Sequence, residues 1–326
     1  MKKRIISGAI YVLVLFVFYS LKVMIPYGDV CFDVLIYAFA LIGAKEMIRA
    51  MGDSVARTEK AIVYVFAVVC IPACAIGEYL WGYGVHFTAI CFFILTVSLL
   101  SLLVFKPQES NLENIGAAFV CAVYPTLLLS LLVLANHIGQ NPWFGEKFIN
   151  DYSQDLQSIK FNSDLAILFI FSISPIADAT AFFTGMLLRK KFPKKLAPEI
   201  SPKKTVVGFI GGLVGGMLAA VIIYFVYPLI VIGIEQIFPQ GQVLVYADFM
   251  KHMYIWLPVY IVIGLFAALA SAFGDLVESA IKRKRGLKDM GDIMPGHGGV
   301  LDRIDGTLFT AIVVYAAFAL VLLVAI

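Results

Sequence analysis

The sequence predicts an all-α, polytopic integral membrane protein with about nine transmembrane helices. Three observations lead to this fold class. Hydrophobic residues make up 61% of the 326 residues and charged residues only 14%, and the mean hydropathy is +0.92. So few charges could not cover the surface of a soluble globule, and long apolar runs recur along the chain.

Nine apolar segments have about the length that a helix needs to cross a membrane, roughly 20 residues. They lie at residues 5–25, 30–50, 61–80, 86–105, 115–137, 164–188, 205–233, 254–281 and 303–326. The first is too long for a signal-peptide core and lacks a small-residue cleavage site, so we expect it to be retained. The second is the weakest, because Lys45, Glu46 and Arg49 lie in its last turns.

The basic residues indicate the orientation, because cytoplasmic loops of membrane proteins are enriched in Lys and Arg. With nine spans and a cytoplasmic N-terminus, only Lys22, Lys147, Lys160 and Lys251 fall outside the inner side. We therefore expect an external C-terminus. The outer loops around residues 138–163 and 234–253 show no recognisable chemistry. We divide the chain into residues 1–137, with five spans, and residues 138–326, with four spans and a cytoplasmic-face active site.

Carboxylates, cations, a histidine and glycines crowd together only between Ser271 and Asp305. The charged and glycine-rich part includes Asp275, Lys282, Arg283, Lys288, Asp292, His297, Gly298, Gly299, Asp302 and Arg303. Carboxylates are typical magnesium ligands, and Lys and Arg bind phosphate oxygens. Successive glycines let backbone N–H groups approach an anion. The segment therefore predicts a nucleotide-phosphate and metal site at a membrane surface.

Asp178 lies inside the apolar segment 164–188. A carboxylate in a membrane helix costs roughly 2.5–3.5 kcal/mol on insertion scales, so a functional role is the first expectation. Pro175, three residues earlier, interrupts the helical hydrogen-bond ladder nearby. The alternative is a structural carboxylate satisfied by hydroxyls such as those of Ser174 or Thr180.

The run Ser201-Pro202-Lys203-Lys204-Thr205 precedes the seventh span. Ser201 is expected to be the N-cap of the helix and Pro202 its first residue. Lys203 and Lys204 would then lie at the positive end of a helix, which is unfavourable unless phosphate binds there. Ordinary cytoplasmic charge is the alternative. Glycines at three- and four-residue spacing follow and favour a helix-packing face, namely Gly208, Gly211, Gly212, Gly215 and Gly216.

Asp275 shares a helical face with Ser271 and Ser279, four residues before and after it. Gly274 permits another helix or a ligand to approach closely. Asp275 and Asp302 are expected to share a divalent metal if the last two spans pack side by side.

Residues Ser279 to Asp305 resemble the signature of the phosphatidate cytidylyltransferase (CDP-diacylglycerol synthase) family. The resemblance is carried by Ser279-Ala280-Ile281-Lys282-Arg283, Lys288-Asp289 and Pro295-Gly296-His297-Gly298-Gly299-Val300-Leu301-Asp302-Arg303-Ile304-Asp305. Met294 departs from it mildly, where Ile, Leu or Phe is expected. The blocks at 178–185, 201–212 and 271–275 are similar as well, whereas the first five spans match only as generic hydrophobic helices.

The resemblance implies that CTP and phosphatidate react to CDP-diacylglycerol and pyrophosphate, with Mg²⁺ and a nearby K⁺. It implies catalytic roles for Asp275, Asp302, His297, Lys288 and Arg303. It implies substrate binding by Ser201, Lys203, Lys204, Thr205, Lys282, Arg283, Gly298 and Gly299, and metal binding by Asp275, Asp302 and Asp178. The expected location is the bacterial inner (cell) membrane, with membrane lipid and no nucleic acid as partner. A homodimer is left open.

Two other functions share some of these features. A transporter also carries intramembrane carboxylates and glycine-rich helices, but it does not need a long charged block at one interface, and no inverted repeat is visible. A CDP-alcohol phosphotransferase carries paired aspartates in a DG-x2-AR…G-x3-D-x3-D run. Here Asp305-Gly306 is followed by Thr307, Leu308 and Phe309, so that run is absent.

Overall fold

The computed structural model describes residues 2–139, 161–237, 249–294, 296 and 298–324. These residues are almost entirely helical, which confirms the predicted all-α class. The chain divides into two compact units. Unit 1 comprises residues 1–137 and 281–304, and unit 2 comprises residues 138–280 and 305–326. Residues Ile281–Ile304 group with the N-terminal helices, and the expected division into residues 1–137 and 138–326 stays a prediction.

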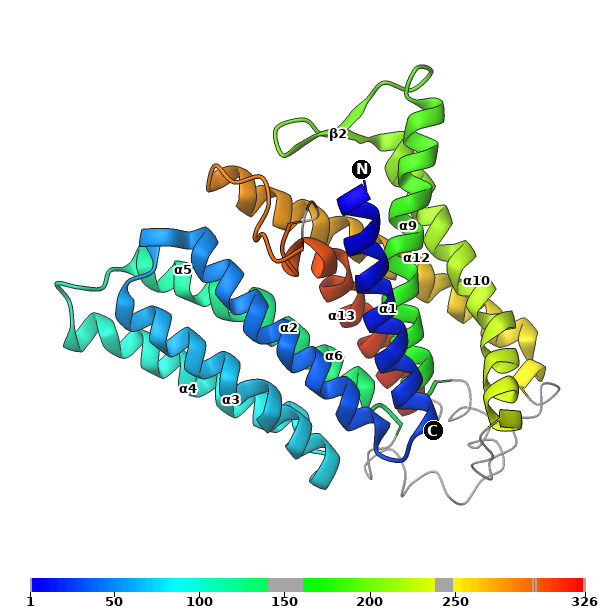
Figure 1. Cartoon of the computed structure of the whole chain (residues 1–326), viewed down its shortest axis with the longest axis horizontal. Helices are drawn as coiled ribbons and strands as arrows, with labels where there is room; N and C mark the ends of the chain where they lie inside the picture. Colours follow the sequence, from blue (N-terminus) through cyan, green and yellow to red (C-terminus); the bar gives the residue numbers. More distant parts are fainter. Residues whose placement is uncertain (1, 140–160, 238–248, 295, 297, 325–326) are drawn as a thin grey trace. The chain divides into compact units, whose positions relative to one another are not determined.

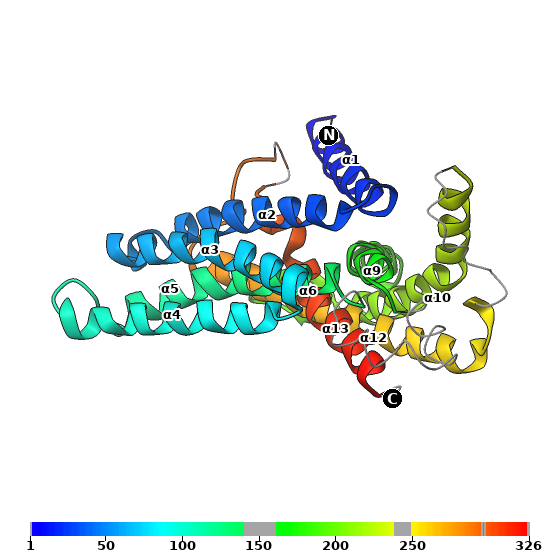
Figure 2. The ribbon, with the colours of Figure 1, turned by 90° about the horizontal axis from the view of Figure 1, so that it is seen from below.

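Unit 1 is built from antiparallel helices, with α3 and α4 forming a closely packed hairpin (Figures 1 and 2). Its elements are α1 (Lys2–Met24), α2 (Gly28–Met51), the short 3₁₀ helix η1 (Gly52–Ser54), α3 (Arg57–Trp81), α4 (Gly84–Phe105), α5 (Leu112–Ala122), the π-helical turn η2 (Val123–Leu127) and α6 (Leu128–Asn136). Pro125 lies in η2. Because proline cannot donate the helical hydrogen bond, the ladder widens there and α5 continues into α6 through a π turn.

Unit 2 is organised around the long pair α9 (Ser163–Leu188) and α10 (Val206–Ile237), followed by α12 (Met253–Lys284) and α13 (Leu301–Val324). The division between the units falls inside α12 and α13. Between α9 and α10 the chain forms a small antiparallel hairpin of β1 (Lys195–Ala197) and β2 (Ser201–Thr205). Figure 1 shows this hairpin at the end of α9 and α10.

The glycines of α10 form the predicted packing face. A Cβ at Gly208 would lie 2.8 Å from the carbonyl oxygen of Ala181, and one at Gly212 would lie 3.2 Å from that of Ala177. A Cβ at Gly211 or Gly215 would overlap a threonine side chain of α9. The two backbones therefore approach closely because the side chains between them are missing.

Aromatic rings from several parts of unit 2 meet in its core. Phe161 contacts Tyr260 and Phe318 with ring centroids 5.6 and 5.1 Å apart, and Tyr260 contacts Tyr224 at 5.0 Å. Phe161, Tyr224, Tyr260 and Phe318 are fully buried. Edge-to-face contacts of this kind favour one arrangement of the rings and stabilise the core beyond the burial of apolar area.

Eight helices in the described part of the chain are long and apolar enough to cross a membrane. They account for eight of the nine expected spans. The remaining expected span, residues 30–50, lies within α2, which has the required length but was the weakest on sequence because of its charged last turns. Most of the two expected outer loops, residues 140–160 and 238–248, lies outside the described residues, and the orientation of the termini stays a prediction.

Candidate functional site

The charged segment that follows α12 begins with a tight turn. The helix ends at Lys284, and Gly286 has a positive φ of 67° while its N–H donates to the carbonyl of Arg283. Gly286 therefore ends the helix in the left-handed conformation that favours glycine. We call residues 285–300 the signature loop. Within it, the N–H of Met294 donates to the carbonyl of Gly298 at 2.9 Å.

Asp302, in the first turn of α13, is the centre of the loop's hydrogen bonds. One carboxylate oxygen accepts the backbone N–H groups of Met290 and Gly299, both at 2.8 Å. The other accepts the ammonium of Lys282 at 2.7 Å. The side chain of Asp302 is only 4% exposed and that of Lys282 12%. Asp302 thus connects the end of α12, the middle of the loop and the start of α13.

Gly298 is required at its position for two reasons. Its φ of 85° lies in the left-handed region that residues with a side chain rarely adopt, and a Cβ there would lie against the carboxylate of Asp302. A substitution would therefore both strain the backbone and displace the carboxylate of Asp302.

Glu46 of α2 was not predicted to take part in the site. Its carboxylate accepts the backbone N–H of Val300 at 3.0 Å and that of Leu301 at 2.9 Å. Glu46 is 3% exposed and, within unit 1, it reaches the start of α13 across 254 residues of sequence. The only signal for it in the sequence was a carboxylate in an apolar helix, which is costly unless something satisfies it.

Two arginines fix the outer part of the signature loop. Arg49 of α2 donates to both carboxylate oxygens of Asp292, at 2.6 and 3.3 Å. This guanidinium lowers the pKa of the Asp292 carboxyl from its ordinary value. Arg285 donates to the hydroxyl of Ser54 in η1 at 2.6 Å. Because both pairs are exposed, they orient the loop more than they stabilise it.

Unit 2 contains a second charged cluster around Asp275. The ammonium of Lys204 donates to one of its carboxylate oxygens, and the hydroxyl of Ser279 donates to the other at 3.2 Å. The side chains of Lys204 and Asp275 are 29% and 26% exposed. Ser279 therefore shares the face of Asp275 as the sequence predicted, and the pair is open to solutes.

The seventh span, expected from residue 205, begins at Val206, but its cap is not the expected one. Ser201 and Pro202 lie in β2, so the predictions that they are the N-cap and the first helical residue are wrong. Residues before a proline favour extended backbone, and β1 supplies a pairing strand. Thr205 has the capping role instead, because its hydroxyl accepts the N–H of Gly208 at 3.1 Å.

Small residues bring α9, α12 and α13 together in unit 2. The hydroxyls of Ser174 and Ser271 are hydrogen-bonded at 2.8 Å, and both lie against Gly306. A Cβ at Gly274 would lie 2.6 Å from the ring of Phe309. The close approach predicted at Gly274 is therefore made by α13. Asp178 lies on α9 with an exposed side chain.

The other predicted site residues fall into both units. Arg283, Lys288 and Arg303 of unit 1 and Lys203 of unit 2 have exposed side chains that can meet an anionic ligand. Gly298 and Gly299 are buried. His297 lies outside the described residues, so its predicted role stays a prediction.

The donor chemistry of Asp275 fits a magnesium ion. Magnesium takes carboxylate oxygens together with water and substrate phosphates, and Asp275 offers a partly exposed carboxylate. Asp302 already receives three hydrogen bonds, so a metal would have to share its oxygens with these donors. Across the residues that the structure describes, no group of three or more His, Cys, Asp or Glu side chains gathers as a metal site.

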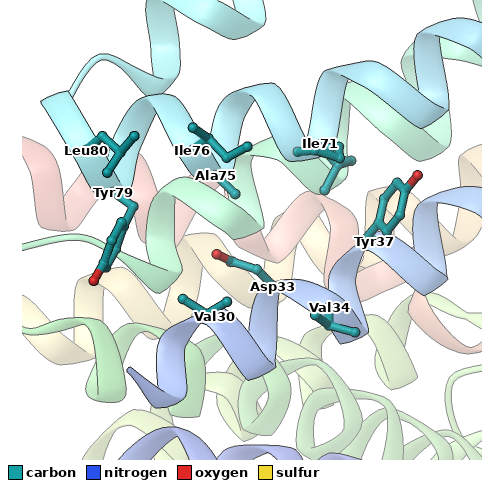
Figure 3. A pocket seen from close by; sticks show the side chains of 10 residues that line it. Val30, Asp33, Val34, Tyr37, Ile71, Ala75, Ile76, Tyr79 and Leu80 are labelled. Atoms are coloured by element: carbon teal, nitrogen blue, oxygen red, sulfur yellow. The ribbon is translucent and has the colours of Figure 1, made fainter. Parts of the chain in front are cut away.

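A separate apolar cavity of about 560 Å³ lies between α2 and α3. Figure 3 shows its lining side chains, with Asp33 among them. The Asp33 carboxylate is 2.7 Å from a ring nitrogen of His137 and accepts the side-chain amide of Asn136 at 2.9 Å. None of the predicted site residues lines this cavity.

Known proteins resemble this chain along its length. The sequence model of the Cytidylyltransferase family matches residues 2–321. A phosphatidate cytidylyltransferase of Bacillus subtilis is 29% identical over 321 residues, which covers 98% of each chain. A protein of the same name from Staphylococcus saprophyticus is 38% identical over 143 residues, or 44% of this chain and 45% of that one. One from Staphylococcus aureus is 39% identical over the same length.

Proposed function

The chain belongs to the Cytidylyltransferase family, and from this premise we propose that it is a phosphatidate cytidylyltransferase of a bacterial membrane. It would convert CTP and phosphatidate to CDP-diacylglycerol and pyrophosphate. The observation that carries the proposal is the extent of the match, which takes in residues 2–321 and so includes both charged clusters. The apolar helices agree with a lipid substrate whose acyl chains stay in the bilayer.

The reaction joins two anions and releases a third. A phosphate oxygen of phosphatidate attacks the α-phosphorus of CTP, the new P–O bond forms, and the bond to pyrophosphate breaks. Such a transfer depends on alignment and charge neutralisation more than on covalent help from the protein. Exposed Lys203, Arg283, Lys288 and Arg303 are suited to the triphosphate and the phosphatidate headgroup.

The pair of Lys204 and Asp275 is suited to a nucleotide that arrives with a divalent cation. In the structure the ammonium and the carboxylate neutralise each other. When the ligand arrives, the ammonium can turn to a phosphate oxygen while the carboxylate turns to the cation. No charge is left unpaired at either stage, which keeps the cost of rearrangement small.

We propose that the partly exposed carboxylate of Asp275 would hold magnesium, and the expected metal roles of Asp178 and Asp302 stay predictions. Magnesium bound to Asp275 would neutralise the charge that develops on the phosphate oxygens. The expected contact of Gly298, Gly299 and His297 with the leaving pyrophosphate stays a prediction, and in the structure the N–H of Gly299 donates to Asp302. A nearby K⁺ and a homodimer stay predictions.

The decisive experiment measures CDP-diacylglycerol formation by purified protein supplied with CTP, phosphatidate, Mg²⁺ and K⁺. We expect turnover by wild type, a loss of at least about 100-fold in Asp275→Asn, and wild-type turnover in the matched control Asp53→Asn. Asp53 is exposed in η1 and lies outside both clusters. No turnover by folded wild-type protein would refute the proposed function. Undiminished turnover by Asp275→Asn would keep the enzyme and refute the role of Asp275.

A further inference from the structure

Three residues of α2 with a spacing of three contact the signature loop and the start of α13. A Cβ at Gly43 would lie 3.0 Å from the side chain of Leu301. Glu46 accepts the N–H groups of Val300 and Leu301, and Arg49 pairs with Asp292. A spacing of three places all three on one face of the helix. The C-terminal half of α2 is therefore the surface against which the loop is formed.

Glu46 has the central place on this surface. The first N–H groups of a helix have no partner within the helix, and at α13 the carboxylate of Glu46 supplies acceptors for two of them. A Cβ at Gly291 or Gly299 would overlap this carboxylate. Both glycines therefore leave room for Glu46, and two separate parts of the loop pack against one side chain.

The hydrogen bonds of Glu46 and Asp302 are interleaved along the same short run of backbone. Asp302 accepts the N–H of Gly299, and Glu46 accepts the next two N–H groups, those of Val300 and Leu301. Three consecutive N–H groups are thus fixed by two carboxylates. A displacement of Glu46 must displace Gly299 and Asp302 with it, because they share this backbone.

We propose that Glu46 is a positioning residue for nucleotidyl transfer. It sets the place of the Gly298–Gly299 backbone and of Asp302 without itself contacting the reacting groups. The inference rests on the proposed function, since that function gives these residues their task. A displacement of about 1 Å in a catalytic group can cost about 100-fold in rate. We therefore expect a loss of between about 10- and 100-fold in kcat for Glu46→Gln.

The substitution Glu46→Gln replaces one acceptor oxygen by an amide donor at nearly constant volume. Its matched control is Glu78→Gln. Glu78 is also buried in unit 1, and it accepts the N–H of Gly84 at 2.9 Å at the start of α4. Both variants remove a buried carboxylate that caps a helix, but only Glu46 caps the helix that carries Asp302.

Two measurements on purified protein test the inference. Hydrogen–deuterium exchange without substrates should be faster in the peptides that cover residues 298–302 of Glu46→Gln, and unchanged there in Glu78→Gln. Steady-state kinetics should show the loss in kcat, with the KM for CTP within about threefold of wild type. Wild-type exchange at 298–302, or an equal loss of kcat in Glu78→Gln, would overturn the inference.

Two further variants keep the test decisive if Glu46→Gln does not fold. Glu46→Asp retains the charge and both acceptors but is one methylene shorter, so it should show a lower kcat and faster exchange at residues 298–302 than wild type. In Gly299→Ala the new methyl group would overlap the Glu46 carboxylate. Its loss of activity should not add to that of Glu46→Asp, because both variants disturb the same contact. Additive losses would overturn the inference. Because exchange is measured without substrate, a failure of the proposed function and a failure of this inference are distinguishable.

Discussion

Replacement of Asp302 by Asn should cost stability as well as activity. The carboxylate accepts two backbone N–H groups at 2.8 Å and the ammonium of Lys282 at 2.7 Å. Asn has one oxygen and one NH₂ group, so it cannot serve both sides. Whichever way the amide turns, an NH₂ group faces either the ammonium or the two N–H donors.

The expected loss follows from the burial of the pair. A hydrogen bond to a charged group contributes about 1.5–3 kcal/mol, and removal of one partner from a buried ion pair costs about 3–5 kcal/mol. The Lys282 side chain is 12% exposed, and the Asn oxygen still accepts on one side. We therefore expect Asp302→Asn to lower the free energy of unfolding by the lower end of this range, about 3 kcal/mol. For a unit of this size it corresponds to a fall in Tm of roughly 6–12 °C.

The buried cysteines of unit 1 provide the assay. Cys70, Cys74 and Cys121 are free and buried, and they belong to the same unit as Asp302. Cys31 and Cys91 of the same unit are partly exposed, so the rise in labelling by a thiol-reactive fluorophore above their initial signal reports the thermal opening of this unit in detergent. The matched control is Asp292→Asn, in the same loop, because the Arg49–Asp292 pair is exposed at both partners and exposed pairs contribute little.

The comparison has a clear refuting result. If Asp302→Asn melts at the same temperature as wild type, the hydrogen bonds of Asp302 do not organise the loop. If the Tm of Asp292→Asn is as low as that of Asp302→Asn, the loop is sensitive to the loss of any charge. Burial of the ion pair then does not decide how much stability is lost.

Three further predictions concern unit 2 and the metal. Lys204→Met should lower kcat/KM for CTP by at least about tenfold, because it leaves Asp275 without its cationic partner; unchanged kinetics would exclude Lys204 from the site. Thr205→Val should lower the free energy of unfolding by about 1 kcal/mol, since the N–H of Gly208 loses its cap; a denaturant titration monitored by tryptophan fluorescence measures it. Chelation by EDTA should abolish CDP-diacylglycerol formation and added Mg²⁺ should restore it; turnover that persists in EDTA would contradict the metal-assisted reaction.

The helices and their packing faces were predictable because the signals are local. Runs of apolar residues predicted eight helices that satisfy the requirements of a span. The spacing of Gly208, Gly211, Gly212 and Gly215 predicted the face along which α10 packs on α9. Each of these features depends on residues within one or two turns of each other.

The cap of α10 was predicted incorrectly, although its signal was also local. Ser201 and Pro202 fit the first positions of a helix equally well in sequence, but they lie in β2. The difference is made by Lys195–Ala197, which pairs with this segment as β1. Pairing between strands is a tertiary choice, and here it takes precedence over local capping preference.

The residue types of the candidate site could be predicted from the sequence, but its connections could not. Carboxylates, lysines, arginines and glycines between Ser271 and Asp305 were enough to indicate phosphate and metal chemistry, and the extent of the family match supports that indication. Which carboxylate meets which cation was not readable. Lys204 contacts Asp275 across 71 residues of sequence, and Lys282 contacts Asp302 across 20.

Glu46 shows most clearly the difference between what is local in the sequence and what depends on tertiary contacts. The apolar run at residues 30–50 was enough to predict a helix, and Lys45, Glu46 and Arg49 marked its last turns as charged. Only the tertiary structure decided what satisfies that carboxylate, the N–H groups of Val300 and Leu301 more than 250 residues later. Helix formation depends on neighbours in the chain, whereas the partner of a buried charge depends on which helix ends the fold brings together.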